Sequence, residues 1–139
     1  MGIMSSKTER NRRAIARTLI AMDQSWLALF GELGLSELSY SDLLTQMWLR
    51  QDEELHKTDL YDFMPNVSRR TAVKYVQHLI DTGLLTQTES AQDRRVRNIA
   101  LTPPLLTRLA QFYDETWAHF NTEREQTMPQ RRVRTPRSG

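Results

Sequence analysis

A long apolar pattern near the start of the chain has the spacing of a helix. Its members alternate between four and three residues apart, at Ile15, Leu19, Met22, Trp26, Leu29 and Leu33. Side chains with this spacing share one side of a helix, so the pattern predicts a helix with a continuous apolar stripe that ends near Gly31 and Gly34. A second apolar flank, at Ile20, Leu27 and Phe30, is wider than one packing surface requires. We therefore expect part of this helix to pack against another chain.

The next stretch predicts a medium helix followed by a short one. "SYSD" offers a hydroxyl cap at Ser39 or Ser41, and "RQDEELHK" closes the medium helix. Its apolar positions are Leu43, Leu44, Met47 and Trp48. The short helix is expected over residues 58–64, with Thr58 as its cap, because Pro65 prevents continuation.

A further helix follows, and its outer side is charged. Ser68 is expected to cap this helix, and Thr82 and Gly83 are expected to end it. The inward residues are expected to be Ala72, Val76 and Leu79, with Val73 and Ile80 beside them. The outward residues are Arg69, Arg70, Lys74, Gln77 and His78.

Two short stretches then alternate apolar and polar residues, as half-buried strands do. They are "LLTQTE" and "VRNIAL", and "SAQDRR" between them predicts a hairpin. Pro103 and Pro104 suit the first turn of a last helix. The apolar stripe of that helix consists of Leu105 or Leu106, Leu109, Phe112 or Tyr113, Trp117 and Phe120.

This order of elements predicts a winged helix-turn-helix in the mainly α (α+β) class. Two helices joined by a tight turn precede a two-stranded hairpin, called the wing. In this design the second helix of the pair enters the DNA major groove, and the hairpin tip lies along the backbone or the minor groove.

Composition and charge narrow the function. The chain has 139 residues, no cysteine, and 39% hydrophobic residues, which suits one domain and excludes disulfides and thiolate metal sites. The net charge of +2 hides a segregation, because residues 66–100 are basic and the segments on either side are acidic. Arg17 and Asp23 interrupt the first apolar stretch, so it is neither a signal-peptide core nor a bilayer span. We expect a cytoplasmic protein with an anionic partner.

Candidate DNA-binding residues lie on the fourth helix and on the hairpin tip. Arginine and lysine side chains pair with phosphates and base edges, and hydroxyls at a helix start add phosphate contacts. The candidates are Ser68, Arg69, Arg70, Thr71, Lys74, Tyr75, Gln77, His78, Asp93, Arg94, Arg95 and Arg97. A solvated charged surface without a partner is the plainer alternative.

Within this region the sequence resembles the multiple-antibiotic-resistance regulator (MarR) family of bacterial transcription factors. The resemblance rests on "SRRTAVKYVQHLIDTGLL" followed by "DRRVRNIALT", and it is best from Val67 to Thr102. The matching positions of the helix are Ser68, Thr71, Leu79 and Gly83, and those of the wing are Asp93, Arg94, Arg95, Leu101 and Thr102. Two stretches depart from the family pattern: the bulky "YDFMPN", and the prolines at 103 and 104.

The resemblance implies a homodimeric regulator, expected to be a repressor, that binds a pseudo-palindromic double-stranded operator. Residues 7–34 and 104–125 would be dimerisation helices, residues 39–102 the DNA-binding lobe, and residues 126–139 a flexible basic tail. One wing arginine would enter the minor groove. Arg94 is the best candidate, with Asp93 and Arg95 as a supporting ion pair, although the choice between the arginines stays open.

Many members of the family release DNA when a small aromatic ligand binds between the dimerisation helices and the lobe. Trp26, Trp48 and Trp117 are candidates for lining such a pocket, and a plain core role for them is the alternative.

Other chemistries have little support in the sequence. His56, His78 and His119 are far apart and have no metal-ligand spacing, and the carboxylates of Asp52 to Glu54 suit a solvated helix end. There is no glycine-rich phosphate loop or nucleophile motif. We expect no enzyme, no metal and no cofactor. The alternative function is a winged-helix module that binds protein in a replication or assembly complex.

Overall fold

The computed structural model describes residues 6–127. Most of the tail expected from residue 126 onward therefore lies outside the described residues. The elements, in chain order, are α1 (Ser6–Phe30), the 3-10 helix η1 (Gly31–Leu33), α2 (Leu38–Leu49), α3 (Lys57–Asp62), α4 (Arg69–Asp81), β1 (Leu85–Glu89), β2 (Arg97–Leu101) and α5 (Pro103–Thr127). The predicted class, mainly α with a two-stranded wing, is confirmed.

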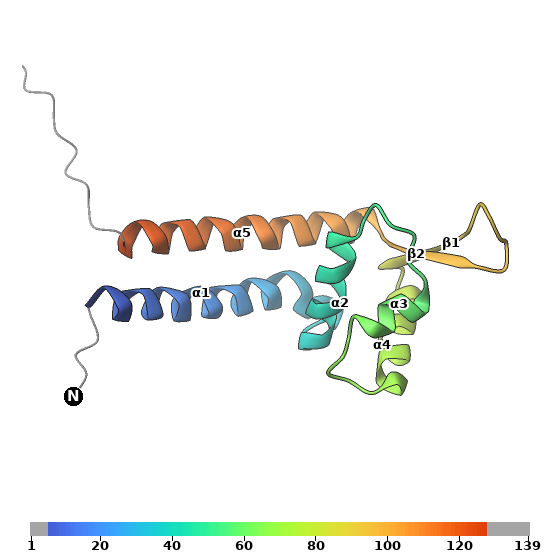
Figure 1. The fold of residues 1–139 in the computed structure, drawn as a ribbon, viewed down its shortest axis with the longest axis horizontal. Coiled ribbons are helices and arrows are strands. Elements are labelled where there is room, and N and C mark those ends of the chain that lie inside the picture. The colour runs from blue at the N-terminus through green and yellow to red at the C-terminus, as the bar shows by residue number, and fades with distance from the viewer. Residues whose placement is uncertain (1–5, 128–139) are drawn as a thin grey trace, which may run out of the picture.

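The molecule consists of a two-helix arm and a smaller lobe (Figure 1). The arm is α1 and α5, which lie side by side and run in opposite directions. Each has 25 residues, which corresponds to about 37 Å of helix at 1.5 Å per residue. The lobe contains α2, α3, α4 and the β1–β2 hairpin, and it lies at the end of the arm where α1 ends and α5 begins.

Polar bridges join the two helices of the arm. Arg17 Nε lies 3.0 Å from Glu123 Oε2, and Ser25 Oγ donates a hydrogen bond of 2.6 Å to Glu115 Oε2. The bond from Ser25 is the main reason why the pKa of Glu115 is lowered. Nearer the lobe, Arg108 Nη1 donates to Glu32 Oε1 at 2.9 Å.

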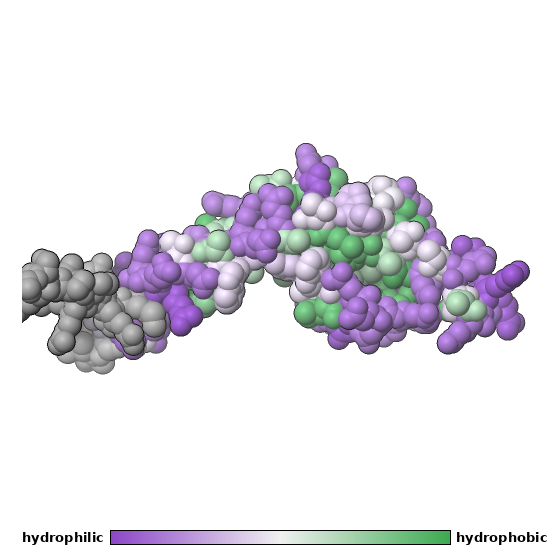
Figure 2. Space-filling view, turned by 90° about the horizontal axis from the view of Figure 1, so that it is seen from above, coloured by the Kyte–Doolittle hydropathy of each residue, from purple (hydrophilic) through white to green (hydrophobic). Residues whose placement is uncertain are grey.

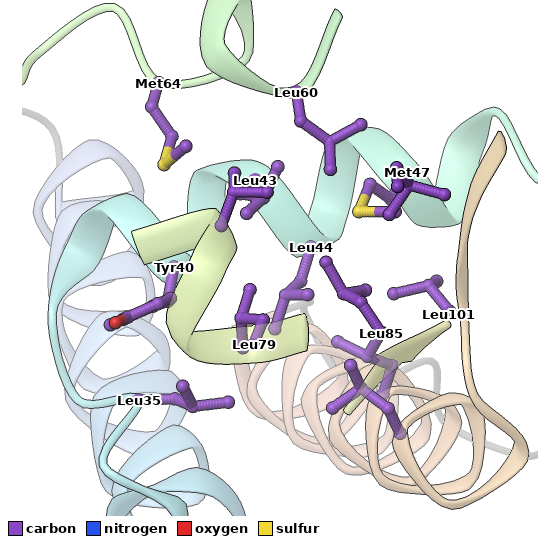
Figure 3. Packing of buried hydrophobic residues seen from close by; sticks show 14 of the residues in the cluster. Leu35, Tyr40, Leu43, Leu44, Met47, Leu60, Met64, Leu79, Leu85 and Leu101 are labelled. Atoms are coloured by element: carbon purple, nitrogen blue, oxygen red, sulfur yellow. The ribbon is translucent and has the colours of Figure 1, made fainter. Parts of the chain in front are cut away.

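The core of the lobe is built where α2, α4 and the hairpin meet. Figure 3 shows Leu43 and Leu44 of α2, Leu79 of α4 and Leu85 of β1 converging on one another. The hairpin is antiparallel, with Leu85 opposite Leu101. A backbone hydrogen bond of 2.8 Å from Ile99 N to Leu55 O attaches β2 to the segment that follows α2. The hairpin is thus anchored at its base, and its tip projects from the lobe.

The helix starts differ from the predicted ones at α2 and α3. Helix α2 begins at Leu38 without a side-chain cap, so neither Ser39 nor Ser41 caps it. Helix α3 begins at Lys57 after His56, because the Asp59 carboxylate accepts a hydrogen bond of 2.8 Å from the His56 amide. The predicted ends at Gly34 and Gly83 agree with the structure. Both glycines have φ of 75°, a left-handed conformation that is unfavourable for other residues.

The predicted apolar stripe of α1 is only partly correct. The buried residues of α1 are Ala14, Thr18, Trp26 and Phe30. Ile15 and Leu19, by contrast, are about half exposed, as are Ile20 and Leu27 of the second flank. The small Ala14 and Thr18 occupy the buried side instead, and the Thr18 hydroxyl is satisfied by donating to Ala14 O at 2.8 Å. The bulky residues at the start of the predicted stripe therefore stay about half exposed instead of being buried against α5.

Two other residues expected to face inward are exposed. Val73 of α4 exposes 42% of its surface, and Trp117 of α5 exposes 64%. On α5 the buried residues Leu105, Leu109 and Phe112 agree with the prediction.

No helix within residues 6–127 has the length and apolar character needed to span a membrane.

Candidate nucleic-acid interface

The start of α4 is a capped helix N-terminus. Ser68 Oγ accepts a hydrogen bond of 3.1 Å from the Thr71 amide, as the sequence predicts. The Ser68 hydroxyl in turn lies 3.0 Å from Thr71 Oγ1. Because the first amides of a helix carry partial positive charge, this end of α4 favours an anion. Ser68 and its neighbours Arg69 and Arg70 are exposed there.

Arg69 is held at this end by the unusual "YDFMPN" segment. Its guanidinium carbon lies 4.7 Å from the centre of the Tyr61 ring, in a cation–π arrangement. Its Nη1 is 3.9 Å from Asp62 Oδ1, at the end of α3. The bulky Tyr61 thus orients an arginine at the junction between the two helices.

The outer side of α4 carries an open depression with a mixed lining. Its lining residues are Arg70, Val73, Lys74, Gln77, His78 and Asp81. Gln77 Nε2 donates to Asp81 Oδ1 at 2.7 Å, which restrains the Gln77 amide. Sequence reasoning missed Val73 as a member of this surface. Val73 follows Arg70 by three residues and precedes Gln77 by four. Residues with this spacing share one side of a helix, so the sequence does contain the signal that places Val73 on this surface.

Two candidate residues are partly buried against α2. The Tyr75 ring stacks on Tyr40 with 4.5 Å between ring centres, and the His78 ring lies 6.3 Å from the Tyr40 ring. Burial raises the pKa of the Tyr40 phenol, and Tyr75 and Glu37 act in the same direction. Tyr75 therefore packs α4 onto α2, whereas Arg70, Lys74 and Gln77 lie exposed on the other side of the helix.

Asp93 organises the tip of the hairpin. Its carboxylate accepts a hydrogen bond of 3.0 Å from the Arg95 amide and lies 3.4 Å from Arg95 Nε. Its carbonyl accepts a hydrogen bond of 3.0 Å from the Val96 amide. The tip is thus a tight turn stabilised by the aspartate, and the ion pair expected between Asp93 and Arg95 is present. Its role in holding an arginine for DNA stays a prediction.

Four candidate cations have no carboxylate partner among residues 6–127. They are Arg70, Lys74, Arg94 and Arg97, all exposed. The first two lie on α4 and the other two on the hairpin, which is at the same end of the molecule (Figure 1). Figure 2 shows that the outermost part of this end, at the hairpin tip, is mostly hydrophilic. Unpaired cations on two neighbouring elements give a surface suited to a polyanion.

The three tryptophans lie in different surroundings. Trp26 is buried, and its Nε1 donates to Leu35 O at 2.8 Å. Trp48 packs against Tyr113 with 5.0 Å between ring centres. Trp117 is exposed, with its ring centre 6.2 Å from that of Phe120. Trp26 contacts Phe112, but Trp117 does not join this aromatic group.

An open, solvent-accessible cavity of about 290 Å³ lies beside Trp48, between α2 and α5. Its lining residues are Thr45, Trp48, Leu49, Ala110, Tyr113 and Asp114. The Tyr113 hydroxyl donates to Thr45 Oγ1 at 3.2 Å. Burial raises the pKa of the Tyr113 phenol, against the opposing effect of this hydrogen bond. The cavity therefore presents a neutral phenol, an indole ring and a carboxylate.

Within residues 6–127 no three histidine, aspartate or glutamate side chains gather in a metal-binding arrangement.

Comparison with known proteins identifies the fold through structure alone. No protein-family model matches the chain, and no curated protein matches its sequence. The S. aureus MepR–DNA complex has a TM-score of 0.61 at 18% identity, with 82% of this chain and 88% of that chain covered. A S. aureus MepR mutant bound to an oligodeoxyribonucleotide has a TM-score of 0.67 at 16% identity, with 91% and 87% covered. The heme sensor protein PefR in complex with heme and carbon monoxide has a TM-score of 0.54 at 17% identity, with 83% and 77% covered. The chain therefore has the winged helix-turn-helix fold of these structures.

Proposed function

We propose that this protein is a sequence-specific double-stranded DNA-binding transcriptional regulator of the MarR type. The observation that carries the proposal is the set of unpaired cations on α4 and on the hairpin tip, at one end of a winged-helix fold. A helix of this width fits the major groove, and basic side chains beside it neutralise phosphates. The solved MepR complexes, which contain DNA or an oligodeoxyribonucleotide, support the same use of the fold.

The active form is proposed to be a homodimer joined through the arm. Ile15, Leu19, Ile20 and Leu27 of α1 and Trp117 of α5 expose more than half of their surfaces. Two helices packed side by side leave these residues in water, and a second copy offers an apolar surface that covers them. A two-fold dimer presents two α4 helices, so the operator would be pseudo-palindromic.

Repression with release by a small aromatic ligand is the regulatory form we propose. The cavity beside Trp48 and Tyr113 supports it, because it lies where α2 of the lobe meets α5 of the arm. A ligand there would contact both parts and favour one arrangement of the lobe relative to the arm. Of the three tryptophans expected at a ligand pocket, this cavity involves Trp48 alone.

Selection of bound fragments from the host genome tests the proposal directly. We expect one enriched pseudo-palindromic duplex, bound by a dimer, whose affinity falls steeply with salt at a log–log slope of about −0.9 per neutralised phosphate. Small aromatic compounds are then titrated into the complex of the protein with this duplex. Release of the duplex by the wild type, but not by Trp48→Ala, would support the cavity as the ligand site.

A protein-binding winged helix predicts a different result. Absent or salt-insensitive binding to every selected duplex would overturn the DNA-binding proposal in its favour. For an arginine substitution on the proposed DNA surface, such as Arg94→Ala, the matched control is Arg12→Ala. This variant removes the same charge, but Arg12 is exposed on α1 at the opposite end of the arm from the hairpin.

A further inference from the structure

The outer side of α4 has one exposed aliphatic side chain among its polar ones. Val73 exposes 42% of its surface, whereas Val76 and Leu79 of the same helix are buried. Arg70 and Gln77 are its neighbours three and four residues away, and all three line the same depression. Val73 is therefore part of the surface that would face a bound duplex.

The charges of this depression indicate which part of α4 comes closest to DNA. Its cations, Arg70 and Lys74, belong to the first two turns of the helix, while its carboxylate, Asp81, is the last helical residue. Phosphates are attracted to the former and repelled by the latter. Val73 lies between the two cations in sequence, so it approaches the groove with them.

An aliphatic side chain in the major groove has few complementary groups. The base edges there present hydrogen-bond donors and acceptors, and the apolar group among them is the 5-methyl of a pyrimidine. Valine is also well suited to a fixed contact, because a β-branched residue in a helix keeps essentially one χ1 rotamer. Its two methyl groups are thus oriented before binding, and little side-chain entropy is lost.

We infer that Val73 contacts the 5-methyl group of a thymine in each half-site and is a specificity-determining residue. This inference rests on the proposed DNA-binding function and assigns a base to one position of the helix. Arg70 and Gln77 supply donors to the neighbouring base edges or phosphates, while Val73 supplies discrimination between thymine and unmethylated cytosine. Because 5-methylcytosine carries the same methyl group, the experiment must distinguish a contact with thymine from a contact with 5-methylcytosine.

Replacement of thymine by deoxyuridine tests the contact, because it removes the methyl group and keeps base pairing. In the duplex selected by the wild-type dimer, each thymine is replaced in turn. We expect one position per half-site at which affinity falls about fourfold, and about fifteenfold when both half-sites are changed, which corresponds to burial of one methyl group at each. In the Val73→Ala variant the thymine and deoxyuridine duplexes should bind equally.

Two comparisons make this result specific. Gln77→Ala lies on the same surface and should retain the deoxyuridine penalty, and Val73→Ala should keep the salt dependence because valine carries no charge. Each cytosine of the duplex is also replaced by 5-methylcytosine, and a Val73-dependent gain there without a thymine penalty would overturn the thymine assignment.

Other results are equally decisive. Equal binding of thymine and deoxyuridine duplexes by the wild type, a selected half-site without thymine, or a penalty that persists in Val73→Ala would overturn the inference and leave DNA binding standing. Failure to select any specific duplex would overturn both this inference and the proposed function.

Discussion

At the residue scale, short-range polar contacts decide which cations are available. Arg95 is engaged by Asp93 and Arg69 by Tyr61 and Asp62, whereas Arg94 has no carboxylate partner within residues 6–127. Among the three arginines of this segment, the family resemblance favours Arg94 for the minor groove and leaves the choice open. Only the turn made by Asp93 distinguishes a restrained arginine from a free one.

Arg94→Ala is expected to weaken duplex binding without loss of folding. Whether Arg94 lies in the minor groove or along the backbone, its removal takes one phosphate-neutralising cation from each protomer, so the salt slope should fall by about 0.9 per protomer, or about 1.8 for the dimer. Fluorescence anisotropy across a salt series measures the slope, and thermal melting checks the fold. The Arg12→Ala control should bind as the wild type does. An unchanged slope in Arg94→Ala would show that this arginine does not contact the duplex.

At the element scale, patterns of period two and of three to four residues predicted the five α-helices and two strands of residues 6–127, but not all of their ends and not the 3-10 helix η1. The hairpin and the cap of α4 agree with the prediction because both depend on neighbouring residues, such as Ser68 with Thr71. The starts of α2 and α3 differ, because a hydroxyl residue near a helix start is not always its cap. At α3 the acceptor is Asp59, three residues inside the helix boundary.

Ser68→Ala is expected to lower the free energy of unfolding by about 1 kcal/mol, as loss of an N-cap does. Urea denaturation of the full chain measures this change. Ser68→Asp is the matched variant, because aspartate also caps a helix and should retain the stability. Its negative charge should nevertheless weaken duplex binding. If Ser68→Ala unfolds at the wild-type urea midpoint, the capping bond does not contribute to stability.

At the scale of the whole molecule, the arm is the part where a single chain leaves large apolar side chains exposed. Helices α1 and α5 bury one side against each other and are joined by bridges such as Arg17–Glu123 and Ser25–Glu115. Helix α1 nevertheless keeps several large apolar residues about half exposed to water. The proposed dimer would stabilise such an arm by covering these residues, and it would also set the spacing of the two proposed DNA-binding surfaces.

Leu27→Glu is expected to convert the proposed dimer to a monomer and to reduce operator affinity strongly. Leu27 exposes 54% of its surface in the single chain, and a carboxylate at a two-fold interface would be buried near its own copy. Sedimentation velocity measures the oligomeric state. Leu38→Glu is the control, because Leu38 is equally apolar and 71% exposed but lies on α2, outside the arm. A monomeric wild type, or a Leu27→Glu dimer of wild-type affinity, would contradict the proposed interface.

The sequence by itself determined the local structure and the candidate chemistry. Helical and alternating periods, the cap at Ser68 and the turn residues around Asp93 act over a few residues, so the chain alone specifies them. The tertiary structure decided which side of each helix is buried, because that depends on contacts between segments far apart in sequence. It exposed Val73 and Trp117, separated Trp117 from Trp26 and Trp48, and brought α4 and the hairpin to one end of the molecule. The proposed base contact of Val73 follows only from that arrangement.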